Sequence, residues 1–252
     1  LSWDAIKNQN VRWNISANFT TLKNEFTKLP QEEIIDGSKK LMEGRSIYDY
    51  WLREWYGVDP DDGAALYRAE DPEDADNRIF GSDTLTTDVN NARYYYAGTA
   101  IPDLYGSFSS SLRVFGFDLS VMFTYQVGGL VLDYNFQDAM SSGTYGTGMS
   151  TEILNRWQQP GDVTNVPRMD ASETSNFNAT SSRWLTDASF LNLRHLTLAY
   201  NIPASVFSKA GMSRARVYVS GENLFLVNAR KGMNVQQNFS GTTSNVYTHS
   251  RV

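Results

Sequence analysis

The 252-residue sequence predicts an all-β fold, and specifically an antiparallel transmembrane β-barrel. Several stretches alternate apolar and polar side chains, which is typical of strands with one apolar and one polar face. Along the sequence, short connections between these stretches alternate with long ones. Outer-membrane barrels likewise have short turns at one rim and long loops at the other. No stretch approaches the roughly 20 consecutive apolar residues of a membrane helix, so a helical membrane protein is excluded.

The first clear strand covers residues 11–20, after a polar turn at residues 7–10. Its apolar side chains are Val11, Trp13, Ile15, Ala17 and Phe19, and polar residues alternate with them. About nine residues at roughly 3.3 Å each, with a tilt near 40°, rise a little over 20 Å. This rise nearly matches the apolar band of an outer-membrane barrel, which is about 25 Å tall.

A hairpin is predicted at residues 107–126. One side of its second half carries Phe117, Leu119, Val121, Phe123 and Tyr125. The other side is polar except for Met122, and the first half of the hairpin alternates in a similar way. Because the two halves meet at Phe115 and Gly116, we expect a tight turn there.

Two further strands are predicted at residues 190–203 and 214–225, with a short connection between them. Their apolar faces carry Leu196, Leu198, Tyr200, Ile202, Ala215, Val217 and Val219. His195, Arg216 and Glu222 fall on the polar faces, which would line the lumen of a barrel. A structural network of charges is the expected role of Arg216 and Glu222.

Long connections are predicted at residues 22–44, 70–96, 128–188 and 227–249. The aromatic-rich stretch 46–56 alternates imperfectly and leads to a turn at residues 59–63. Ser150 is expected to cap a short helix that ends before Pro160. The acidic run at residues 70–76 lacks the spacing of an EF-hand, so we expect a solvated loop.

Composition narrows the possible functions. The net charge of -6 leaves no basic surface for nucleic acid. The absence of cysteine excludes disulfides, thiol catalysis and cysteine-bound metals. His195 and His249 are the two histidines of the sequence, which are too few for a typical multi-histidine metal site. We therefore predict no catalytic residue, no bound metal and no cofactor.

The same alternation would also suit a soluble sandwich, in which the apolar faces pack on a second sheet. Burial of Ile15, Val121, Phe123 and Leu198 against a second protein layer would therefore contradict the barrel. The alternative function is a secreted, soluble, β-rich glycoside hydrolase or carbohydrate-binding module, which the aromatic content of 13% would also suit. A hydrolase needs two carboxyl groups about 5 to 9.5 Å apart, and the sequence singles out no such pair.

Four phrases in a fixed order resemble a known family: YAGTAIPDLYGSFSSSLRVFGFDLSVMFTYQVGG, NRWQQPGDVTNVPR, LNLRHLTLAYNIP and RVYVSGENLF. They resemble the C-terminal barrel region of the SusC/RagA family, the TonB-dependent outer-membrane transporters of Bacteroidetes. The resemblance implies a barrel of 22 strands around an N-terminal plug, with about eight of the strands in this sequence. Residues 1–252 would then be the C-terminal part of the barrel with long extracellular loops, without the plug domain and the final strand.

The resemblance also implies a function, which is import of oligosaccharides or oligopeptides across the bacterial outer membrane by a multi-pass protein without enzymatic activity. The implied partners are a SusD-like surface lipoprotein that acts as a lid, TonB acting through an N-terminal region absent from this sequence, the cargo, and the lipid bilayer. A dimer of transporter–lid pairs is a further assembly that the family implies.

Candidate contacts with cargo or lid lie in the longest connection. They are Asp133, Tyr134, Tyr145, Trp157 and Trp184. The aromatic side chains could stack on sugar rings, pack the loops or lie at the lid interface. The carboxylate could bind substrate hydroxyl groups or a loop cation, or it could be solvated or cap a helix. The sequence leaves these roles open.

Overall fold

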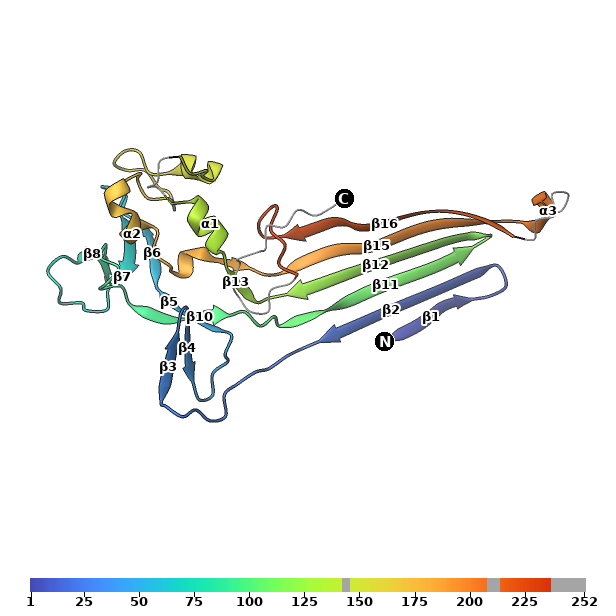
Figure 1. Cartoon of the computed structure of the whole chain (residues 1–252), viewed down its shortest axis with the longest axis horizontal. Coiled ribbons are helices and arrows are strands. Elements are labelled where there is room, and N and C mark those ends of the chain that lie inside the picture. The colour runs from blue at the N-terminus through green and yellow to red at the C-terminus, as the bar shows by residue number, and fades with distance from the viewer. Residues whose placement is uncertain (142–145, 208–213, 237–252) are drawn as a thin grey trace.

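The computed structural model describes residues 1–141, 146–207 and 214–236. It consists of a long six-stranded sheet and, at one end of that sheet, a compact body of short strands and helices (Figure 1). We call the six-stranded sheet the wall. We call the compact body, which is formed by residues 21–103 and 128–189, the loop body.

The wall is antiparallel throughout. Its strands, in spatial order, are β1 (Ser2–Lys7), β2 (Val11–Thr20), β11 (Leu104–Val114), β12 (Phe117–Val127), β15 (Phe190–Ile202) and β16 (Ala215–Asn228). Every strand predicted from clear alternation lies in this sheet, so these predictions are confirmed. The alternation fixes the register, since a slip of one residue would turn the apolar side chains to the other face.

A two-residue turn joins β11 to β12, as the sequence predicts. Phe115 and Gly116 both have positive φ angles, 45° and 89°. Positive φ at both central residues is the requirement of a type I′ turn, whose twist matches that of the flanking strands. The connection between β1 and β2 is also short and lies at the same end of the wall (Figure 1).

The long connections leave the wall at its opposite end and build the loop body (Figure 1). Residues 21–103 join β2 to β11, and residues 128–189 join β12 to β15. The predicted asymmetry is confirmed for the short turns at residues 7–10 and 115–116 and for the long connection at residues 128–188. The predicted long connections at 22–44 and 70–96, with the short turn at 59–63, instead belong to the single connection 21–103. Residues 208–213 and 237–249 of the other two predicted connections lie outside the described residues. None of the helices in the described ranges is both long and apolar enough to cross a membrane.

The number of wall strands differs from the expectation. Six strands pair in the wall of the described residues, against the expected eight or so, and the sheet is open. The predicted strand signals at residues 46–56 and 64–68 belong to the loop body instead, as β5 (Asp49–Arg53), β6 (Trp55–Val58) and β7 (Ala65–Arg68). The physical reason is burial, because Ala65, Leu66 and Tyr67 in succession are buried, whereas a wall strand has to alternate.

The loop body contains three small sheets and several short helices. The first sheet has the order β10-β5-β4-β3, with β3 (Glu33–Asp36), β4 (Lys39–Met42) and β10 (Tyr94–Thr99). The second has the order β6-β7-β9-β8, with β8 (Arg78–Phe80) and β9 (Asp83–Thr86). The third pairs β13 (Leu130–Leu132) with β14 (Leu185–Asp187).

The helices of the described residues are short. They are α1 (Tyr134–Ala139), η1 (Thr151–Asn155), η2 (Ala171–Glu173), α2 (Thr174–Phe177), η3 (Ser182–Trp184) and α3 (Ala204–Phe207). Ser150 caps η1, as predicted, and its Oγ accepts a hydrogen bond of 3.2 Å from the Glu152 amide. All except α3 lie in the loop body; α3 follows β15 at the other end of the wall (Figure 1).

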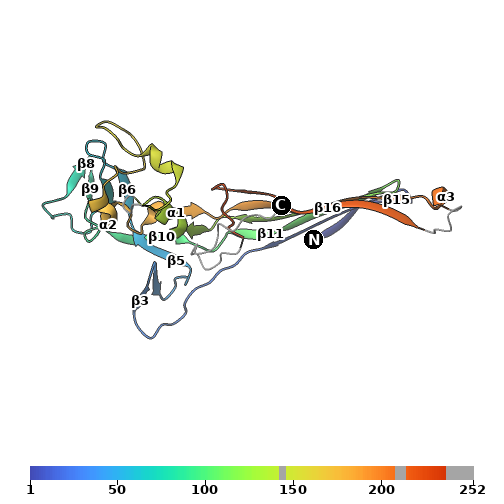
Figure 2. The same ribbon diagram turned by 45° about the horizontal axis from the view of Figure 1, so that its top comes forward.

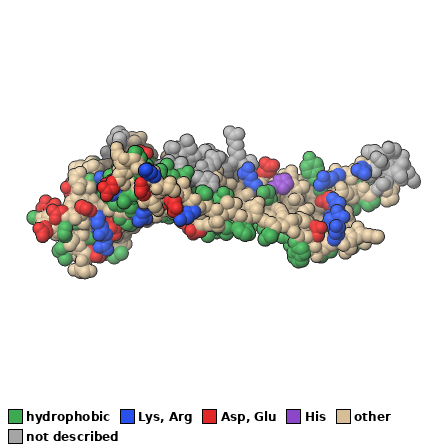
Figure 3. All heavy atoms as spheres, turned by 90° about the horizontal axis from the view of Figure 1, so that it is seen from below, with side chains coloured by type: hydrophobic (Ala, Val, Ile, Leu, Met, Phe, Trp, Pro, Cys, Tyr) green, Lys and Arg blue, Asp and Glu red, His purple; other side chains and the backbone are tan. Residues whose placement is uncertain are grey.

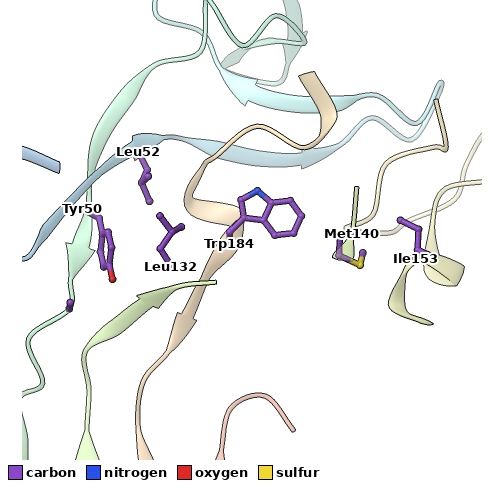
Figure 4. Packing of buried hydrophobic residues seen from close by; sticks show 7 residues of the cluster. Tyr50, Leu52, Leu132, Met140, Ile153 and Trp184 are labelled. Carbon is purple, nitrogen blue, oxygen red and sulfur yellow. The ribbon is translucent and has the colours of Figure 1, made fainter. Parts of the chain in front are cut away.

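The hydrophobic core of the protein lies in the loop body, because the wall is a single layer. One buried cluster gathers side chains from both long connections (Figure 4), namely Tyr50, Leu52, Ala100, Leu132, Met140, Ile153 and Trp184. A second cluster contains Ala64, Ala65, Tyr67, Ala92 and Phe177. The two connections therefore fold as one unit.

Candidate functional site

Cross-strand pairing gathers the apolar side chains on one face of the wall. Residues directly opposite one another in an antiparallel sheet point to the same face. One row across all six strands reads Ile6, Trp13, Leu112, Leu119, Leu198 and Val219. The apolar face is thus continuous across the strands.

No second layer of the described chain covers this apolar face, as the view in Figure 2 shows for the wall. Leu198 is 46% exposed, and Ile15, Val121 and Phe123 are partly exposed. The burial that would contradict a barrel is therefore not found. A continuous apolar surface of this extent is unfavourable in water and marks a membrane or protein contact.

The opposite face of the wall is polar and hydrogen-bonded between strands. The Ser16 and Ser109 hydroxyls are 2.7 Å apart, and the Asn18 amide donates to Ser107 Oγ at 2.8 Å. On this face His195 pairs directly with Glu222. One apolar and one polar face on each strand is the arrangement of a barrel strand between lipid and an aqueous lumen.

Asp133 is fully buried at the start of α1. Its Oδ1 accepts a hydrogen bond of 3.0 Å from the Phe136 amide, so it caps the helix. Its Oδ2 lies 3.4 Å from Nε of Arg230. The helix-capping role that the sequence left open is therefore the one that the structure shows for this carboxylate.

Arg230 links the end of β16 to the loop body. Its guanidinium lies 3.5 Å from the centre of the Phe136 ring, and Nη1 donates to Glu152 at 3.1 Å. Beyond it, Met233 and Val235 are buried against Val131, Ala188 and Phe190. Residues 229–236 thus form an anchored segment, which we call the strap, between the wall and the loop body.

Trp184 is 1% exposed and lies in the buried cluster of Figure 4. Its Nε1 donates to the Ala179 carbonyl oxygen at 2.9 Å. The guanidinium of Arg183 stacks 4.4 Å from its ring and 4.7 Å from that of Trp55. These contacts favour the packing role for Trp184, which was the alternative to stacking on a sugar.

Tyr134 and Trp157 are both partly exposed. Tyr134 packs beside the cluster that contains Trp184. Trp157 lies elsewhere, at the turn that follows β6, where Nε1 donates to the Pro60 carbonyl oxygen at 3.0 Å. Its ring lies so close to Gly63 that a Cβ at that position would come within 2.5 Å of it.

The structure therefore brings Asp133, Tyr134 and Trp184 together and places Trp157 apart from them. Tyr145 lies outside the described residues. A partly open pocket of about 450 Å³ lies at the base of the loop body, between residues 22–25, 44–49 and 99–103. Sequence reasoning missed it because its walls come from three separate stretches of the connection 21–103, which only the fold brings together.

Arginine–carboxylate pairs stabilise the turn that holds Trp157. Arg78 donates to both carboxylate oxygens of Asp62, at 3.0 and 2.9 Å, and to Asp59 at 2.5 Å. The hydrogen bond from Arg78 holds the pKa of Asp62 below its ordinary value, because it stabilises the charged carboxylate. Among the described residues, no cluster of three or more histidine, aspartate or glutamate side chains is arranged to hold a metal ion.

Comparison with known proteins gives relatives at low identity. No family model matches the chain. It is 28% identical over 250 residues to TonB-dependent receptor P3 of Formosa agariphila, covering 93% of this chain and 24% of the relative. It is 24% identical over 269 residues to TonB-dependent receptor P39 of the same organism, covering 91% of this chain and 26% of that relative.

Solved structures give the same result for the fold. The structure of the RagAB peptide transporter matches with a TM-score of 0.74 at 24% identity, over 92% of this chain and 25% of that chain. The RagAB peptide importer in its open-open state also gives 0.74, at 23% identity and over 98% of this chain and 26% of that one. The chain thus spans about a quarter of the length of the proteins that it matches. It is similar in sequence and in fold to part of the barrel of TonB-dependent transporters of the SusC/RagA kind, as its sequence predicts.

Proposed function

We propose that these residues are the C-terminal part of a TonB-dependent importer in the bacterial outer membrane. In this proposal the wall spans the membrane, with its apolar face toward lipid and its polar face toward the lumen, and the loop body is extracellular. The observation that carries the proposal is the uncovered apolar face of the wall, opposite a hydrogen-bonded polar face. A plug domain and the remaining strands would come from the rest of the protein.

The cargo in this proposal is an oligosaccharide or an oligopeptide. A SusD-like lipoprotein would cover the loop body as a lid, TonB would act through an N-terminal region, and two transporter–lid pairs could form a dimer. The resemblance to the family supports these partners, and the RagAB structures supply a peptide importer with the same fold in this region. The protein would move cargo by opening and closing, with no covalent step.

Within the loop body, Tyr134 and Trp157 are the better candidates for contact with cargo or lid, because both are partly exposed. Asp133 and Trp184 would position Tyr134 from inside the core. Tyr145 remains a prediction from the sequence.

A soluble β-rich hydrolase or carbohydrate-binding module is less consistent with the structure. Such a protein would have to bury the apolar face of the wall in its own core, and the described residues supply no layer to do so. The curated relatives that the chain matches are named as receptors.

Neighbouring residues on one strand offer a matched test of this function. Ser120 and Val121 are successive residues near the middle of β12, on opposite faces of the wall. In the full-length protein, Val121→Arg should prevent outer-membrane assembly and TonB-dependent uptake of labelled cargo, because an arginine facing lipid near mid-membrane costs about 2–4 kcal/mol. Ser120→Arg should assemble normally. Equal assembly of the two variants would contradict the proposal.

A further inference from the structure

One face of the sheet β10-β5-β4-β3 packs on the core of the loop body, and the other carries a row of aromatic and basic side chains. The register pairs Tyr94 with Arg53 and Tyr96 with Trp51, so these side chains share one face. Leu52 lies between Trp51 and Arg53 in β5 and points the other way, into the buried cluster of Figure 4. Together with a neighbouring arginine, the row consists of Arg45, Trp51, Arg53, Tyr94 and Tyr96, which we call the arginine–aromatic ladder.

Both guanidinium groups of the ladder lie over aromatic rings. The Arg45 guanidinium is 4.1 Å from the centre of the Tyr96 ring, and that of Arg53 is 4.9 Å from the centre of the Tyr94 ring. The Trp51 ring lies between them, with its centre 4.8 Å from that of Tyr96 and 6.3 Å from that of Tyr94. In the view of Figure 3, lysine and arginine side chains lie among hydrophobic ones on the loop body. A guanidinium that stacks on a ring keeps the N–H donors in its own plane for other partners.

The two arginines of the ladder have no carboxylate partner in the described part of the chain. Neither guanidinium lies within 4.0 Å of an aspartate or glutamate oxygen there. Arg45 is exposed, and Arg53 donates a hydrogen bond of 3.0 Å to the Val89 carbonyl oxygen. Lys40, which also lies over a ring of this face, is by contrast paired with Glu33 at 2.5 Å. Because a guanidinium fits carboxylate, sulfate or phosphate groups, each end of the ladder can bind an anion.

The pocket at the base of the loop body adjoins one end of the ladder, because Arg45 is one of its lining residues. Its volume of about 450 Å³ lies in the usual range for small-ligand sites, roughly 300–1,000 Å³. The lining also includes Asn24, Ser46, Asp49 and Asp103. Amide, hydroxyl and carboxylate groups of this kind form hydrogen bonds with the hydroxyl groups of a ligand. The pocket therefore supplies partners for hydroxyl groups beside a cation that has no carboxylate.

An oligosaccharide with acidic groups matches both parts of this surface. Its hydroxyl groups fit the polar pocket, and its carboxylate or sulfate groups fit the arginines. Its sugar rings can lie on the exposed parts of the aromatic side chains. A peptide matches less well, because its backbone N–H and C=O groups also need partners. An extended peptide finds such partners at the edge of a sheet and not over its face.

We propose that the arginine–aromatic ladder and the adjoining pocket bind an acidic oligosaccharide, and that this oligosaccharide is the cargo. The inference rests on the proposed function, in which the loop body is extracellular and meets cargo first. It narrows the cargo to saccharides that carry carboxylate or sulfate groups. The two proposals can fail separately, because binding is measured on purified protein without uptake. Binding without uptake would contradict the importer alone, whereas uptake that is independent of the ladder would contradict this inference alone.

Binding to the purified full-length protein tests the requirement for charge. The acidic probes are a hexamer of galacturonic acid and a chondroitin sulfate hexasaccharide. The neutral probe is the galacturonate hexamer with every carboxylate methyl-esterified, which keeps the sugars and removes the charge. In isothermal titration calorimetry, at least one acidic probe should bind about tenfold or more tightly than the neutral probe. If neither acidic probe binds more tightly than the neutral probe, the proposal is overturned.

Replacement of Arg45 tests whether the ladder supplies the binding site. Arg45→Gln should weaken binding of the acidic probe about tenfold or more, since it removes a charge-assisted hydrogen bond, and should leave the neutral probe unchanged. The midpoint of thermal unfolding should stay the same, because Arg45 is exposed. Arg93→Gln is the matched control, since the Arg93 guanidinium is already neutralised by Glu54, to which its Nε donates at 3.0 Å. An effect of Arg45→Gln no larger than that of Arg93→Gln overturns the proposal.

Two further probes test other acidic occupants of the same surface. A hexaglutamate peptide represents an acidic polypeptide, and lipopolysaccharide micelles represent the acidic sugars of the membrane surface. Each should bind wild type and Arg45→Gln equally. Binding of either probe that is tighter than that of the acidic hexasaccharides, and that is weakened in Arg45→Gln, would overturn the assignment to a saccharide cargo.

Discussion

Asp133 and Arg230 join the strap to the loop body through a contact that is buried on the aspartate side. The sequence marks Asp133 as a candidate for binding because a carboxylate in a long loop can meet a ligand. It gives no sign of the pairing, because Arg230 lies far away in the chain, beyond β15 and β16. Trp184 is comparable, since its neighbours in the core come from the other long connection and from distant parts of its own. For both residues the sequence shows the type of side chain, but only the tertiary fold shows which groups that side chain contacts.

Loss of the Asp133 carboxylate should loosen the strap and α1 together. Asp133→Ala removes the helix cap and leaves Arg230 without its buried partner, a change that typically costs about 3–5 kcal/mol. Hydrogen exchange of the α1 amides in the full-length protein should therefore accelerate more than 100-fold, or about 3 kcal/mol. Glu152→Gln, which alters the exposed partner of Arg230, should change exchange little, since exposed pairs contribute about 0–1 kcal/mol. Equal rates of hydrogen exchange in the two variants would contradict the role of Asp133 in anchoring the strap.

Stability of the loop body should depend on pH through Asp62. The pKa of Asp62 is lowered in the folded state, chiefly by the hydrogen bond from Arg78. Its contribution to the free energy of unfolding is therefore fully present above the ordinary aspartate pKa. This contribution is lost as pH falls through the lowered pKa. Arg78→Gln should therefore unfold at lower urea concentration near neutral pH, and the difference from wild type should shrink below about pH 4. Tryptophan fluorescence of the full-length protein during urea titration at each pH measures the urea concentration at which each variant unfolds. A difference that does not change with pH would contradict the assignment.

At the level of elements, the sequence predicts the wall well and the loop body poorly. The strands β2, β11, β12, β15 and β16 alternate over most of their length because each separates two environments, so a period of two residues identifies them. Strands such as β7 are buried on both faces and have no such period. The pairing of β5 with β10 brings together residues more than forty positions apart, which alternation alone does not encode.

The turn between β11 and β12 offers a test at this level. Phe115 is an exposed, bulky residue held at a positive φ, where asparagine is better tolerated. Phe115→Asn should therefore stabilise the hairpin, by up to about 1 kcal/mol, whereas Gly116→Val should destabilise it by a similar amount or more. Thermal unfolding of the assembled full-length protein ranks the variants. A stability order with Gly116→Val above Phe115→Asn would contradict the type I′ geometry.

At the scale of the whole molecule, the wall and the loop body differ in how they bury apolar side chains. The loop body buries its apolar side chains in cores of its own. The wall leaves its apolar side chains uncovered, and one edge of β1 and one edge of β16 are unpaired among the described residues. Unpaired strand edges are very costly in hydrocarbon, so the wall can serve in a bilayer only as part of a closed barrel. This requirement agrees with the similarity of the chain to about a quarter of much longer transporters.

The most direct test of this account measures which side of β12 meets lipid. The sequence contains no cysteine, so single cysteines can be introduced at residues 117–126 of the full-length protein one at a time, provided that the rest of the protein is also free of cysteine. After fluorescent labelling in lipid vesicles, a lipid-soluble quencher should act on the odd-numbered positions and a water-soluble quencher on the even-numbered ones. Uniform quenching along the strand, or protection of the odd-numbered positions from the lipid-soluble quencher, would contradict the account.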